Sequence, residues 1–126
     1  MAFEKFSRSA ARTDTGARWI SIQANGAISV SYSALKEIGL PDEVFLLHDP
    51  EGDRIAVQAA DPGSRDAYKM RLQGSGDNPH GARVVSANAF FRHIGLDAGR
   101  AKNRYEARIE GDMVIADIPS HAFDGS

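Results

Sequence analysis

Apolar and polar residues alternate with strand periodicity in two stretches of the chain, and each alternation then changes to helical spacing. The first stretch predicts strand 19–23, strand 28–30, a short helix over 34–38, strand 44–47 and strand 54–59. Asn25-Gly26 between the first two strands predicts a two-residue hairpin turn. Gly39 stands where a left-handed residue ends a helix, and Asp49–Asp53 is typical of a β-turn. The expected unit is strand, strand, short helix, strand, strand.

The second stretch repeats this order with longer connections. It predicts strand 67–73, strand 83–86, a helix over 89–94, strand 105–109 and strand 113–118. Tyr68, Met70 and Leu72 share one face of its first strand, and Lys69 and Arg71 share the other. A glycine-rich loop at 74–81 replaces the tight turn, and a basic loop is expected at 100–104.

The two stretches are also similar residue by residue. Gly26–Leu40 returns as Gly81–Leu96 with one extra residue, and Glu51-Gly52-Asp53 returns as Glu110-Gly111-Asp112. A repeated unit of this size cannot bury its own apolar face, so we expect the copies to pack together. The expected organisation is an N-terminal arm at 1–18, repeat one at 19–60, a linker at 61–66, repeat two at 67–118 and a tail at 119–126.

Composition fits one compact domain, but the charge is divided unequally. The chain has 126 residues, no cysteine and a net charge of -2. Residues 19–63 carry two basic and seven acidic side chains, whereas residues 64–110 carry nine basic and five acidic ones. Repeat one is therefore acidic and repeat two basic. The N-terminus lacks the pattern of a secretory signal, no apolar run approaches the roughly 18 residues of a membrane span, and cysteine is absent, which together predict a cytoplasmic protein.

The residues indicate neither catalysis nor a metal site. His48, His80, His93 and His121 form no pair at helical spacing. Asp49–Asp53 begins like a calcium loop, but Ala60 stands where the bidentate glutamate is required. A serine elbow, a nucleophilic cysteine and paired helical carboxylates are all missing, so we predict no enzyme, no metal and no cofactor.

The pattern Gly-x-Ile-x-Val followed by Ala-Leu-Lys-Glu-Ile-Gly-Leu, with its second copy, resembles the swapped-hairpin family of AbrB, SpoVT and MazE. Two copies in one chain resemble the arrangement of MraZ. The resemblance covers about residues 18–59 and 67–118. It implies a mainly β fold with short helices, built from two tandem ββαββ swapped-hairpin repeats. The chain differs from the family in having Ser31 and Ser86 where a proline is typical, and Leu35 and Lys36 where arginines are common.

The resemblance also implies a function, a DNA-binding transcriptional regulator that acts as a homodimer on double-stranded DNA. The expected contacts are basic side chains of repeat two and of the arm: Lys69, Arg71, Arg83, Arg92, Arg100, Lys102, Arg104, Arg8 and Arg12, with Lys5 and Arg18 beside them in the arm. Arg71 and Arg83 lie on strands expected to be neighbours and are predicted to form one ridge. The alternative is a non-enzymatic oligomerisation or protein-interaction module, similar to an antitoxin, that binds a protein partner.

Overall fold

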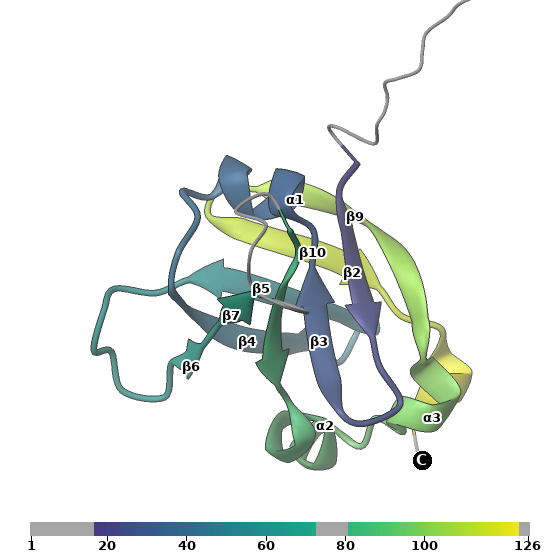
Figure 1. The fold of residues 1–126 in the computed structure, drawn as a ribbon. Helices are drawn as coiled ribbons and strands as arrows, with labels where there is room; N and C mark the ends of the chain where they lie inside the picture. Colours follow the sequence, from purple (N-terminus) through teal and green to yellow (C-terminus); the bar gives the residue numbers. More distant parts are fainter. Residues whose placement is uncertain (1–16, 73–80, 124–126) are drawn as a thin grey trace, which may run out of the picture.

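The computed structural model describes residues 17–72 and 81–123, which form a mainly β structure with short helices (Figure 1). Its strands are β2 (Trp19–Ile22), β3 (Ala27–Val30), β4 (Glu43–Asp49), β5 (Arg54–Ala59), β6 (Tyr68–Lys69), β7 (Arg71–Leu72), β8 (Arg83–Ser86), β9 (Asn103–Glu110) and β10 (Met113–Asp117). Its helical elements are α1 (Tyr32–Glu37), α2 (Asn88–Ile94), α3 (Ala98–Ala101) and the 3₁₀ turn η2 (Ser120–Ala122).

All of these strands join one antiparallel sheet that is nearly closed. The strand order is β6-β4-β5-β10-β9-β2-β3-β8-β7. The two strands at the ends of this order, β6 and β7, are separated along the chain only by Met70. One short segment therefore joins both edges of the sheet, and closure leaves few backbone groups without a ladder partner.

Adjacent pairs of strands from the two halves of the chain alternate around this sheet. Strand β2 pairs with β3 on one side and with β9 on the other. Strand β6 pairs with β4, and β7 pairs with β8. The two halves also meet directly, because β5 pairs with β10 and β3 pairs with β8. Residues 19–60 and 67–118 thus form one sheet with one core.

The core lies inside the closed sheet and is covered at both ends by helices. Ile20, Val30, Val57 and Val114 point inward and are fully buried. Helices α1 and α2 lie at opposite ends of the sheet in Figure 1, and their buried side chains join the same core: Ala34, Leu35, Phe90 and Phe91. Both helices are too short to persist in water without this packing.

The hairpin between β2 and β3 differs from the predicted two-residue turn. The N–H of Gly26 donates to the carbonyl of Gln23, and the N–H of Gln23 donates to the carbonyl of Ala27. The central residues of the turn are therefore Ala24 and Asn25, and Gly26 follows them with φ +93°. This is a three-residue loop in which glycine takes the left-handed position, so the prediction of an Asn-Gly turn was wrong.

The predicted strand 67–73 is divided at Met70, and Gln73 lies outside the described residues. Met70 is buried, and its N–H donates to the carbonyl of Asp42. The alternation itself is confirmed, since Lys69 and Arg71 are exposed on either side of this buried side chain. The division arises because the ladder partner changes from β4 to β8 at this point.

The basic segment 100–104 is not a loop, contrary to the prediction. Arg100 lies in α3, Lys102 follows the end of this helix, and Arg104 lies in β9. The carboxylate of Asp97 accepts hydrogen bonds from the N–H groups of Gly99 and Arg100. A side-chain cap at this position satisfies free N–H groups of a helix start, which explains the short helix here.

Ser31 has a structural role that accounts for the absence of a proline there. It is the N-cap of α1, and its Oγ accepts hydrogen bonds from the N–H groups of Trp19 and Ala34. We expect Ser31→Ala to lower the free energy of unfolding by about 1–2 kcal/mol, because one buried and one partly buried N–H group lose their acceptor. Chemical denaturation measures this loss.

Ser86 provides the matched control for that variant. It occupies the equivalent position of the second copy but is exposed. The residue that precedes α2 is Ala87, which provides no side-chain cap. We expect Ser86→Ala to change stability by less than about 0.5 kcal/mol. Equal losses for the two serines would contradict the capping role of Ser31.

Candidate nucleic-acid interface

The predicted DNA contacts that lie in the described part of the chain occupy several elements. Lys69 is exposed on β6, Arg71 on β7 and Arg104 on β9. Arg92 is exposed in the last turn of α2, and Lys102 is exposed after α3. The remaining candidates are placed as follows: Arg100 exposed in α3, Arg83 half-buried on β8, and Arg8, Arg12 and Lys5 outside the described residues.

Two of these arginines lie at the ends of one row of register partners. The row runs from β9 to β7 through Arg104, Ser21, Ser29, Val84 and Arg71. Residues directly opposite each other in antiparallel strands point to the same face. The inward residues alternate with this row, so the row lies on the outer face of the closed sheet. Its two ends each carry an exposed cation, whereas Ser29 and Val84 in its middle are buried.

Arg83 does not join this row. The register places Val84 opposite Arg71 and Arg83 opposite Leu72. Because successive residues of a strand point to opposite faces, Arg83 and Arg71 diverge. The predicted ridge of these two arginines was wrong, although the predicted pairing of their strands is confirmed.

Arg104 has an aromatic neighbour that the sequence did not reveal. Its guanidinium carbon lies 3.8 Å from the centre of the Trp19 ring. Trp19 is half-buried on the outer face of β2. A guanidinium on an aromatic ring is held in place while its edge N–H groups stay available to an anion. The strand pairing of β2 with β9 creates this contact, and residues 85 positions apart give no local signal of it.

Other arginines are occupied by carboxylates of the same chain. Arg18 lies 2.8 Å from Glu37 of α1, so the end of the predicted arm contacts the folded part. Arg100 lies 3.7 Å from Asp97. These exposed pairs add little to stability, but they reduce the local positive charge that an anionic partner meets.

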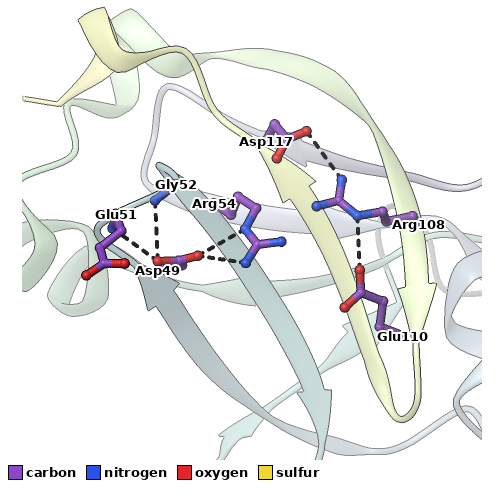
Figure 2. Close-up of polar contacts among 7 residues, drawn as sticks. All are labelled: Asp49, Glu51, Gly52, Arg54, Arg108, Glu110 and Asp117. Carbon is purple, nitrogen blue, oxygen red and sulfur yellow. Dashed lines mark hydrogen bonds and ion pairs between the residues drawn. The ribbon is translucent and has the colours of Figure 1, made fainter.

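Figure 2 shows two further ion-pair groups, on β4–β5 and on β9–β10. Asp49 accepts hydrogen bonds from the Arg54 side chain and from the N–H groups of Glu51 and Gly52, and Arg54 holds the pKa of this carboxyl below its usual value. The predicted turn at Asp49–Asp53 is confirmed, and this carboxylate organises it.

Arg108 of β9 lies on the same face of the sheet as Arg54, between two carboxylates. Its Nη1 is 3.3 Å from Asp117, and its Nε is 3.2 Å from Glu110. The hydrogen bond to Asp117, and to a smaller extent the one to Glu110, raises the pKa of Arg108 above its usual value. An open hollow of about 430 Å³ beside Arg108 is lined by Tyr105, Glu106, Ala107 and Asp117 as well. Its carboxylates make it unsuitable for an anion.

Within residues 17–72 and 81–123, no three histidine, aspartate or glutamate side chains converge as metal ligands. His93 is exposed on α2. Phe90 and Phe91 are buried in the core. None of the helices in this part of the chain has the length and apolar character needed to cross a bilayer.

Comparison with known proteins identifies no relative. No protein-family model matches the chain, and no curated protein or solved structure matches it significantly. The fold and the surface therefore provide the evidence for function.

Proposed function

We propose that this protein is a DNA-binding transcriptional regulator built from two tandem ββαββ repeats that interleave within one chain. DNA contacts would come from exposed basic side chains of the second repeat, led by Arg71 and Arg104. The observation that carries this proposal is the row of register partners that ends in these two arginines on the outer face of the sheet.

The order of strand pairing supports the interleaved arrangement. The first strand of each repeat pairs with the third strand of the other, since β2 pairs with β9 and β6 pairs with β4. The second strands pair with each other, as do the fourth strands. Exchanging the two repeats therefore leaves the whole ring of pairings unchanged. This is the relation expected if a swapped-hairpin dimer were joined into one chain.

The distribution of charge supports contact through the second repeat. Residues 64–110 carry nine basic and five acidic side chains, and residues 19–63 carry two and seven. Arg71 and Arg104 remain exposed, and Lys69 lies beside Arg71 along the same segment. Phosphate contacts by such side chains supply affinity and release counterions, while side chains that reach base edges supply specificity.

Fluorescence anisotropy with a random-sequence duplex pool tests the proposal. Affinity should fall steeply with salt, and the double variant Arg71→Ala/Arg104→Ala should reduce the slope of log K against log[salt] by about 1.8, or about 0.9 per lost phosphate contact. Arg65→Ala is the matched control for Arg71→Ala. It removes the same exposed charge a few residues earlier and lies outside the row.

Two results would contradict the proposal. One is the absence of binding even at low salt. The other is a salt slope that the double variant and Arg65→Ala reduce to the same extent per charge removed, because binding would then reflect net charge alone. Thermal unfolding of each variant confirms that the fold is retained.

A second candidate is a non-enzymatic interaction module that binds a protein. It is favoured by the acidic first repeat and by Leu47, a large apolar side chain that is exposed on β4. This candidate would be supported if the protein does not bind DNA and co-purifies with a protein partner.

A further inference from the structure

The outer face of the β4-β5-β10 part of the sheet is apolar where a solvent-facing strand would be polar. Leu47, Ala56 and Ile115 are register partners and form one lateral row. The next row on the same face contains Phe45 and Met113, with Gln58 between them. These side chains, namely Phe45, Leu47, Ala56, Met113 and Ile115, are called the outer stripe below.

The main core does not account for the outer stripe. Its five side chains lie neither in the buried core cluster nor among the half-buried residues packed against it. Strand β10 begins Met-Val-Ile-Ala, so it is apolar on both faces. Antiparallel strands with one solvated face alternate, whereas near-continuous apolar runs are typical of strands covered on both faces.

Some side chains of the stripe are buried and others are exposed to solvent. Ile115 is only 5% exposed, whereas Leu47, two strands away in the same row, is 37% exposed. Burial of more apolar surface here would be favourable, at about 25 cal/mol per Å². The stripe therefore fits a partner surface of similar apolar character.

The charges around the stripe indicate which partner fits. The charged side chains follow two adjoining edges of the stripe (Figure 2). Asp49, Arg54 and Asp117 are register partners in the row beside that of Leu47, and Arg54 pairs with Asp49. Arg108 lies at the β9 end, in register with Ile115, and pairs with Asp117 and Glu110. The rim therefore alternates in sign and is nearly neutralised within the chain. Such a face does not repel an identical face, and its guanidinium and carboxylate groups are each complementary to groups on a second copy. A strongly acidic or strongly basic partner would require a rim of one sign.

We propose that the outer stripe is the interface of a homodimer in which the β4-β5-β10 faces of two copies pack against each other. This pairing of sheet faces is independent of the proposed DNA contacts, which lie on β7 and β9. Two copies packed in this way would then present two rows that each end in Arg71 and Arg104, related by a twofold axis.

Sedimentation of the full chain from about 1 µM to about 1 mM tests this interface, since weak specific complexes dissociate over that range. Wild-type protein should form dimers. Leu47→Glu should raise the dimer dissociation constant at least tenfold, because it places a carboxylate in the apolar row. Ala56→Glu, in the same row on β5, provides a second variant with the same expectation.

Leu40→Glu is the matched control. Leu40 is a leucine with 36% exposure, but it lies in the connection after α1 and outside the stripe. We expect it to leave the dissociation constant unchanged, and circular dichroism to show the native fold for all three variants. A wild-type monomer across the whole range would overturn the proposal, whether or not another protein binds the stripe. A dimer that survives both Leu47→Glu and Ala56→Glu, or that is lost equally with Leu40→Glu, would also overturn it.

Discussion

Phe91→Ala is expected to lower the free energy of unfolding by about 3–5 kcal/mol, the range for removing a buried aromatic side chain. Phe91 is 3% exposed, and its ring packs beside Phe90 at 6.1 Å between ring centres. Helix α2 has only seven residues, so its stability depends on this docking. The loss would be a large fraction of the stability of a typical domain. Urea unfolding followed by circular dichroism measures it.

Arg92→Ala is the control for this prediction. Arg92 follows directly in the same helix and is exposed, so its removal should change stability by less than about 0.5 kcal/mol. A loss for Phe91→Ala no larger than that for Arg92→Ala would mean that α2 does not close this end of the core.

Gly26→Ala is expected to cost about 2–3 kcal/mol for two separable reasons. Gly26 has φ +93°, where a residue with a side chain is strained by about 1–2 kcal/mol. A Cβ there would also lie 1.8 Å from Oδ1 of Asn88, the first residue of α2. Asn88 must turn away, which costs about 1 kcal/mol more. Thermal or urea unfolding gives the total.

Gly39 and Asn88 separate the two contributions. Gly39 has the same φ, but no atom lies within 4 Å of the Cβ position, so Gly39→Ala should show the backbone strain alone. Asn88→Ala combined with Gly26→Ala should recover about 1 kcal/mol and leave the strain. Additive losses in this double-mutant cycle would show that the contact with Asn88 contributes nothing.

Local sequence patterns predicted the elements well where one strong local signal, such as an alternating apolar face, specifies the element. Alternation located the strands β2, β3, β5, β8 and β10 to within a residue or two, because each has an inward apolar face. Gly39 has positive φ at the end of α1, as the sequence predicted, and Gly95 has positive φ at the end of α2. The errors occurred where non-local partners decide, as at Met70, where the segment changes its ladder partner.

The candidate interface was predicted only in part. Composition indicated a basic second repeat, and the exposed positions of Lys69, Arg71 and Arg104 agree with that. Composition could not indicate that Arg104 lies on Trp19 or that Arg100 is paired with Asp97. Nor could composition show that Arg83 and Arg71 point to opposite faces of the sheet. The face to which a side chain points depends on the register between its strand and the partner strand.

The sequence by itself determined the order of the main strands and of α1 and α2, the similarity of the two stretches and the charge contrast between them, since these follow from local periodicity and composition. It did not predict α3 or the division between β6 and β7. Only the tertiary structure decided which strands pair. Pairing of β9, β2, β3, β8 and β7 creates the row that ends in Arg104 and Arg71, and pairing of β4, β5 and β10 creates the outer stripe. The physical reason is that side chains on different strands meet through backbone ladders between residues far apart in the chain. Such contacts leave no mark on the periodicity of either strand alone.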